Sequence, residues 1–152
     1  LIDCDFKYPV LHRYGVASEF GLADCLTSDV PVEACISACE EVPCWTMPVG
    51  NSKIHANHLL KTNRLADILQ RLRMQFDYIL INTPPILPLA DMNVLAAHAD
   101  ALLLIVRAGS TPQQFVRRAL STVRADIPMH VILNGAGSLP HYMYDYQEMA
   151  QV

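Results

Sequence analysis

Polar side chains that could bind a metal ion or a phosphate group follow three apolar runs of this 152-residue chain. They are Asp3 and Asp5 after the first run, Asn82 and Thr83 after the second, and Asn134 after the third. Two carboxylates two positions apart can contribute to a Mg²⁺ shell or accept a hydroxyl proton. The alternative is that they only form turns or cap helices. Because ligands of open α/β sheets bind where the carboxyl ends of the strands meet, three such ends modestly favour a site.

The apolar runs themselves predict buried strands. Residues 78–81 and 101–106 show no polar alternation, which is typical of strands covered on both faces within a parallel sheet. Pro84 and Pro85 end the first of these two runs, because proline lacks the N–H that a ladder requires. The spacing is equally compatible with an ordinary core strand that ends in a turn. Residues 129–133 are predicted to be the last strand.

Helices are predicted between the strands. One precedes residues 78–81 and carries an apolar stripe, with Arg64, Arg71 and Arg73 on a solvated face. The stripe consists of Leu65, Ile68, Leu69, Leu72 and Phe76. A second helix runs from the N-cap Thr111 to about residue 125 and is expected to bury Phe115, Val116, Leu120 and Val123. The predicted fold class is therefore α/β, a three-layer, mostly parallel sheet flanked by helices, in a single domain over residues 1–152.

Composition excludes several classes of protein. Apolar residues make up 52% and charged residues 17%, which indicates a globular chain. The net charge of −4 and the lack of a basic block argue against nucleic acid or an acidic membrane surface as a partner. Apolar runs have the length of strands rather than of a membrane-spanning helix, and no signal peptide is recognisable.

The cysteines and histidines do not form a recognisable metal motif. The five cysteines are odd in number and contain no C-x-x-C pair, so they are interpreted as reduced thiols of a cytoplasmic protein, with Cys4 and Cys44 acting as small strand hydrophobes. His55 and His58 could share a metal ion, but their polar loop favours solvated side chains.

Six segments, in order along the chain, resemble the cytoplasmic kinase domain of the bacterial tyrosine autokinases of exopolysaccharide and capsule synthesis. Residues 1–9, LIDCDFKYP, resemble the Walker A′ strand of that family, and residues 76–86 resemble its Walker B run FDYVIIDTPPI. Residues 101–112 match the strand and loop that end in VRAGxTP. The other segments are 21–26, 47–60 and 131–135. The resemblance implies a P-loop NTPase-like fold of the MinD type, with ATP and Mg²⁺ as cofactors.

The resemblance also implies roles for individual residues. Asp3 and Asp5 match the Walker A′ aspartates, which help to hold Mg²⁺ and activate the incoming tyrosine hydroxyl. Asn134 stands where related ATPases often place an adenine contact, and Thr83 follows the Walker B position. The tyrosine cluster that neighbouring subunits phosphorylate corresponds to Tyr142, Tyr144 and Tyr146. Taken alone, alternating tyrosines would more often form an amphipathic packing edge.

The chain departs from the family pattern at three places. Asn82 replaces the Walker B aspartate, and an amide brings no charge to a site where phosphate must be neutralised. Lys7 replaces an arginine, which keeps the charge but loses the planar fork. No G-x-x-x-x-G-K-[ST] motif occurs, so the P-loop is missing and the N-terminal P-loop strand and helix are expected to be absent. In the family that strand lies beside the Walker B strand, so we expect the sheet to close over the gap or another chain to supply the pairing.

The leading interpretation is a nucleotide-binding, kinase-like domain that is inactive as it stands. One alternative is a degenerate, non-catalytic regulatory or assembly module of a polysaccharide export system. Another is a different MinD-like positioning ATPase, against which the VRAGSTP loop and the tyrosine-rich tail argue. The family resemblance implies a membrane-anchored polysaccharide co-polymerase or a fused membrane segment as partner, self-association, and a location at the inner face of the bacterial plasma membrane.

Overall fold

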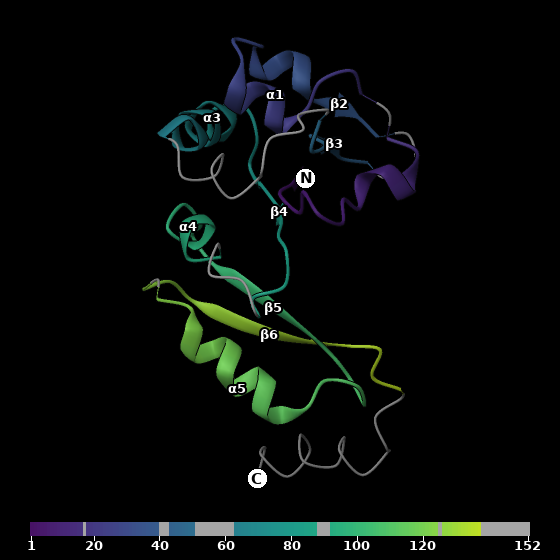
Figure 1. Ribbon diagram of the computed structural model, residues 1–152, viewed down its shortest axis with the longest axis vertical. Coiled ribbons are helices and arrows are strands. Elements are labelled where there is room, and N and C mark those ends of the chain that lie inside the picture. Colours follow the sequence, from purple (N-terminus) through teal and green to yellow (C-terminus); the bar gives the residue numbers. More distant parts are fainter. Residues whose placement is uncertain (17, 40–42, 51–62, 88–91, 125, 138–152) are drawn as a thin grey trace, which may run out of the picture. The chain divides into compact units, whose positions relative to one another are not determined.

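The computed structural model describes residues 1–16, 18–39, 43–50, 63–87, 92–124 and 126–137. The chain divides into two compact units, Leu1–Ala99 and Asp100–Val152. The first unit contains β1 (Ile2–Asp3), η1 (Leu11–Tyr14), α1 (Leu22–Thr27), η2 (Val32–Cys35), β2 (Ser37–Ala38), β3 (Trp45–Thr46), α3 (Asn63–Arg73), β4 (Ile81–Asn82) and α4 (Met92–Ala96) (Figure 1). The second contains β5 (Leu102–Arg107), α5 (Gln113–Thr122) and β6 (Met129–Asn134). That residues 1–152 form a single domain stays a prediction.

Strand β1 is the centre of the first unit. It pairs in parallel with β4, so that Ile2 lies opposite Ile81 and Asp3 lies opposite Asn82. On its other edge, the backbone N–H of Asp3 donates to the carbonyl oxygen of Met47 at 2.9 Å. The carboxyl ends of β1 and β4 therefore lie next to each other, as the sequence predicts. Strands β2 and β3 form a separate antiparallel pair in the same unit.

Two helices supply much of the core of the first unit. The predicted stripe of α3 is confirmed for Leu65, Ile68, Leu69 and Leu72, which are all buried, whereas Phe76 lies beyond the end of the helix and is half-buried. Helix α1 buries four of its six residues, namely Leu22, Ala23, Cys25 and Leu26. Burying each of the larger apolar side chains contributes roughly 1.5–3 kcal/mol, so these two buried faces stabilise the packing of α1 and α3.

The predicted burial of residues 78–81 on both faces is wrong. Tyr78 is 90% exposed and Leu80 is 61% exposed, and the strand β4 contains only Ile81 and Asn82. Among the described residues, β4 pairs with β1 alone, so its other edge has no neighbouring strand. An apolar run is buried only where other layers cover it, and within the first unit no described element covers Tyr78 and Leu80.

The second unit is a parallel pair of strands with one helix. Strands β5 and β6 pair in register from Leu102 opposite Met129 to Arg107 opposite Asn134, and α5 lies along one face of the pair (Figure 1). The expectation that residues 101–106 form a fully buried strand is wrong, because Leu103 and Ile105 are about half exposed. The single helix of this unit covers only one face of the two-stranded pair, so side chains on the other face stay exposed.

Helix α5 also differs from its prediction. Its N-cap is Pro112 rather than Thr111, and no side chain caps it. The hydroxyl of Thr111 instead accepts a hydrogen bond from the backbone N–H of Arg107 at 3.3 Å. Of the residues in α5, Ala119 is buried, whereas Phe115 remains 48% exposed. The predicted burial of Phe115 is thus wrong, and Val116, Leu120 and Val123 are half-buried.

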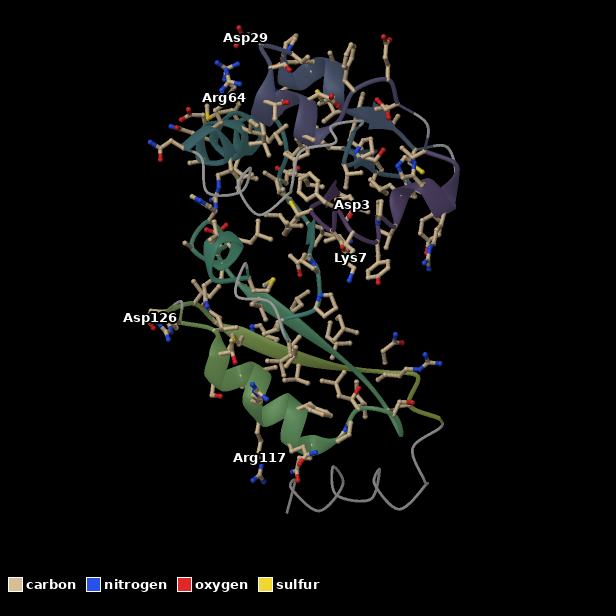
Figure 2. All side chains as sticks on the ribbon, in the orientation of Figure 1. Asp3, Lys7, Asp29, Arg64, Arg117 and Asp126 are labelled. Atoms are coloured by element: carbon tan, nitrogen blue, oxygen red, sulfur yellow. The ribbon has the colours of Figure 1, made fainter. Side chains whose placement is uncertain are left out.

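Arg64 on α3 is not the solvated side chain that the sequence suggests. Its guanidinium donates to the carbonyl oxygens of Leu26 at 3.4 Å and of Ser28 at 3.0 Å, at the carboxyl end of α1. The same group forms an ion pair with Asp29 at 2.8 Å (Figure 2). Helix ends leave carbonyl groups without partners, and a nearby arginine can satisfy them. Arg64 therefore links α3 to the end of α1.

We expect Arg64→Ala to lower the free energy of unfolding of the first unit by about 1 kcal/mol, because two carbonyl groups at the end of α1 lose a charged donor. Asp29→Ala should have no measurable effect, since its side chain is 97% exposed and the ion pair is screened by water. Urea unfolding followed by the fluorescence of Trp45 measures both variants. Equal losses for the two would show that the ion pair, rather than the helix cap, is what matters.

Candidate functional site

The candidate site begins with two side chains that the sheet brings together. Because Asp3 and Asn82 lie opposite each other at the ends of β1 and β4, their side chains meet. The Nδ2 atom of Asn82 donates a hydrogen bond to Oδ1 of Asp3 at 2.9 Å. The structure thereby confirms that the first two polar strand ends converge, although 79 positions separate them in the chain.

Asp3 is completely buried, and both of its carboxylate oxygens accept hydrogen bonds. Besides the amide of Asn82, Oδ1 accepts the backbone N–H of Asp5 at 3.2 Å. Oδ2 accepts the backbone N–H groups of Val10 at 2.7 Å and Leu11 at 3.2 Å. Buried polar groups in folded proteins are nearly always hydrogen-bonded, and these four donors satisfy the carboxylate of Asp3. Asp3 therefore anchors the loop after β1, and its oxygens are already engaged.

Asp5 uses one of its two carboxylate oxygens for hydrogen bonds within the described part of the chain. Its Oδ1 accepts the backbone N–H groups of Lys7 at 3.1 Å and Tyr8 at 2.9 Å, which forms a tight turn after β1. Its Oδ2 has no hydrogen-bond partner among the residues that the structure describes. The side chain is 7% exposed. Of the carboxylate oxygens of Asp3 and Asp5, Oδ2 of Asp5 is thus the one best suited to contact a metal ion or a hydroxyl group.

Lys7 places a positive charge on the same turn. Its side chain is exposed, and its ammonium group lies 5.0 Å from the centroid of the Tyr8 ring. A cation at this distance from an aromatic face is weakly attracted to it, which restrains the position of the charge. In Figure 2, the labelled side chains are those of Asp3, the last residue of β1, and Lys7, in the turn that follows the strand.

Cys4, between the two aspartates, is a neutral core residue. Burial raises the pKa of its thiol to about 12, and the neighbouring charge of Asp3 adds to the rise. Its backbone N–H donates to the carbonyl oxygen of Asn82 at 2.8 Å, which continues the ladder between β1 and β4. Cys4 is thus a small buried residue as predicted, although it follows β1 instead of lying within it, whereas Cys44 is half-buried and directly precedes β3.

For the other predicted site residues, the structure either gives a position in the fold or does not describe the residue. Thr83 is half-buried directly after β4. Asn134 ends β6 in the second unit, where its carbonyl oxygen accepts the backbone N–H of Ala108 at 2.8 Å. Its role in the site stays a prediction. Tyr142, Tyr144 and Tyr146 lie outside the described residues, as do His55 and His58.

Sequence reasoning missed the donors that hold Asp3. They are the backbone N–H groups of Val10 and Leu11, which lie at the start of η1. The one signal for them in the sequence is the general tendency of aspartate to accept hydrogen bonds from nearby backbone groups.

Within the described parts of the chain, no three His, Cys, Asp or Glu side chains are grouped so as to hold a metal ion. No helix in the same residues is long and apolar enough to cross a membrane.

Comparisons with known proteins give the chain a context. No protein-family model matches it. The putative tyrosine-protein kinase EpsB of Ralstonia solanacearum is 29% identical over 149 residues, which cover 96% of this chain and 20% of EpsB. The succinoglycan biosynthesis transport protein ExoP of Rhizobium meliloti is 28% identical over 124 residues, which cover 79% of this chain and 16% of ExoP. The chain thus spans about a fifth of the length of such relatives.

A solved structure extends the comparison to the fold. The crystal structure of the VpsO kinase domain matches with a TM-score of 0.80 and 28% sequence identity, over 90% of this chain and 69% of that domain. The parallel strand pairs and flanking helices described above are thus those of a P-loop NTPase-like fold, which confirms the predicted fold class. The chain is a homologue of bacterial tyrosine-protein kinases and has the fold of their kinase domains.

Proposed function

We propose that this chain is the nucleotide-binding, kinase-like domain of an exopolysaccharide-synthesis tyrosine autokinase, and that by itself it does not transfer phosphate. The observation that carries the proposal is the cluster at the ends of β1 and β4, where Asp3, Asp5 and Asn82 come together within this kinase-domain fold. Ligands of open α/β sheets bind at that edge.

The residues present fit Mg²⁺·ATP in part. When bound, Mg²⁺ would neutralise phosphate charge, and it usually takes only one or two carboxylates besides phosphate oxygens and water. Oδ2 of Asp5 would supply one such ligand, and Lys7 would add positive charge beside the phosphates. Asp3 would hold the loop that carries Asp5 in place and would not itself bind the metal ion, because its oxygens already accept four N–H groups. Asn134 and Thr83 remain candidates for further nucleotide contacts.

Two sequence features support the lack of catalysis. Asn82 brings no negative charge to the Walker B position, although its amide can still hydrogen-bond a water molecule bound to the metal ion. The sequence contains no G-x-x-x-x-G-K-[ST] motif, whose backbone N–H groups and lysine would cradle the phosphates. We therefore expect this chain alone to bind nucleotide weakly.

A specific contact favours a second function, a non-catalytic regulatory or assembly module of a polysaccharide export system. The amide of Asn82 satisfies the buried carboxylate of Asp3 at 2.9 Å. An aspartate at position 82 would place two carboxylates at this distance, which is tolerated only with a cation or a proton between them. The asparagine thus stabilises the site without a metal ion.

The proposal extends to partners and location. The domain would work on the cytoplasmic side of the plasma membrane, with a membrane-anchored polysaccharide co-polymerase or a fused membrane segment as its partner. Self-association would present Tyr142, Tyr144 and Tyr146 to neighbouring copies for phosphorylation. The relative ExoP of Rhizobium meliloti is a succinoglycan biosynthesis transport protein, which supports the link to polysaccharide export.

Calorimetric titration of the full-length natural protein with Mg²⁺·ATP tests the proposal. We expect Asp5→Asn to weaken the Mg²⁺-dependent affinity about tenfold, because a charged metal ligand becomes neutral. Asp29→Asn, a matched exchange at an exposed position, should leave the affinity unchanged. Binding together with labelling of the protein's own tyrosines supports a kinase. Absence of both in the wild type would overturn the nucleotide-binding proposal in favour of the assembly module.

A further inference from the structure

Two buried cysteines of the first unit lie in direct contact. Cys25 belongs to α1 and Cys35 is the last residue of η2, and the two are 5% and 0% exposed. Their Sγ atoms are 2.6 Å apart, only about half an ångström more than the covalent S–S bond length of ~2.05 Å. Both cysteines are free thiols in this structure.

The surroundings keep both thiols protonated. Burial raises the pKa of Cys25, and the hydrogen bond to Cys35 raises it further. Burial is also the main cause that raises the pKa of Cys35. Protonated thiols react slowly with any oxidant, because the thiolate is the nucleophile, and burial also excludes large reagents. Reaction at this pair therefore favours a small, uncharged oxidant, followed by rapid capture of the product by the adjacent sulfur.

We propose that Cys25 and Cys35 form a reversible intramolecular disulfide, an oxidation site that joins α1 to η2. Hydrogen peroxide is the class of oxidant that suits a buried pair. It oxidises one thiol to a sulfenic acid and is reduced to one water. The second thiol attacks the sulfenic sulfur, the S–O bond breaks, and the oxygen leaves as a second water. Two thiols and one peroxide thus yield one disulfide and two waters.

The chain contains a rival pair that makes the proposal specific. Cys39 and Cys44 lie opposite each other beyond β2 and before β3, where the backbone N–H of Cys39 donates to the carbonyl oxygen of Cys44 at 3.0 Å. Both are only half-buried, so reagents reach them more easily. If accessibility decided the outcome, oxidation would link Cys39 to Cys44. If proximity of the sulfurs decides it, Cys25 is linked to Cys35.

Peptide mapping of the oxidised chain distinguishes the two outcomes. The protein is treated with hydrogen peroxide, alkylated in denaturant, cleaved after glutamates such as Glu33 and Glu40, and analysed without reduction by fragmentation mass spectrometry. We expect a Cys25–Cys35 cross-link with the mass of two hydrogen atoms lost, which dithiothreitol reverses. The link should survive Cys39→Ser and disappear in Cys35→Ser.

Recovery of Cys25 and Cys35 as alkylated thiols, or a link between Cys39 and Cys44 alone, would overturn the proposal. The wild-type map decides the matter by itself should Cys35→Ser fail to fold.

Discussion

Replacing Asp3 with alanine is expected to lower the free energy of unfolding of the first unit by about 3–5 kcal/mol. The buried carboxylate accepts N–H groups from Asp5, Val10, Leu11 and Asn82. Alanine leaves these donors without an acceptor, and each buried, unsatisfied donor costs about 1–3 kcal/mol. The total stays below a simple sum because water reaches some of the donors once the carboxylate is gone. Urea unfolding followed by Trp45 fluorescence reports on this unit.

A matched pair of variants makes the result for Asp3 interpretable. Asp3→Asn keeps the volume and one carbonyl oxygen, so its loss should be smaller than that of Asp3→Ala. Asp29→Ala removes an exposed carboxylate and should change stability little. A loss for Asp3→Ala as small as that for Asp29→Ala would mean that the four donors do not depend on this carboxylate, and the structural role of Asp3 would be wrong.

Replacing Asn82 with aspartate is expected to destabilise the metal-free protein by about 2–4 kcal/mol at neutral pH. The exchange removes the hydrogen bond to Asp3 and places a second carboxylate where the amide now lies, 2.9 Å from Oδ1. Two carboxylates this close cannot both ionise easily, so the pKa of one rises in the folded state above its unfolded value. The penalty is therefore present above the folded pKa and disappears as the pH falls below the unfolded pKa.

Magnesium should reverse part of this loss. In the variant, the paired carboxylates at the ends of β1 and β4 would attract a divalent cation, and binding to the folded state alone raises stability in proportion to the logarithm of Mg²⁺ concentration. We expect Mg²⁺ to raise the Tm of Asn82→Asp by several degrees and that of the wild type by little. Potassium chloride at equal ionic strength controls for screening. Equal responses of the two proteins to Mg²⁺ would argue against a metal site at this edge.

The spacing of apolar residues within one segment predicted those features of the fold that depend on that segment alone. The stripe from Leu65 to Leu72 predicted both α3 and its buried face, because helical periodicity depends only on the residues of the helix. The burial of Tyr78 and Leu80 was predicted wrongly, because burial depends on which other elements cover the run. The apolar sequence alone does not contain that information.

In the candidate site, too, some features could be predicted from the sequence and others depend on contacts between distant segments. Polar residues directly after apolar runs predicted that Asp3 and Asn82 would meet, since parallel strands bring their carboxyl ends together. The engagement of both Asp3 oxygens was not predicted, because it depends on how residues 6–11 return over the strand. The contacts of Arg64 were missed for a related reason, as its partners at the end of α1 lie 35 or more positions away.

Among the described residues of the first unit, β4 has one edge without a neighbouring strand, and such an edge affects how a protein behaves at high concentration. Such an edge, with Tyr78 and Leu80 exposed beside it, is a template onto which another extended chain can add by backbone hydrogen bonds, and natural sheets usually block such edges to avoid aggregation. Pro84 and Pro85 limit such pairing just beyond the end of β4, because neither can donate an N–H. Growth along this edge must therefore end at Thr83, so an added chain would extend the sheet without crossing the carboxyl ends where Asp3 and Asp5 lie.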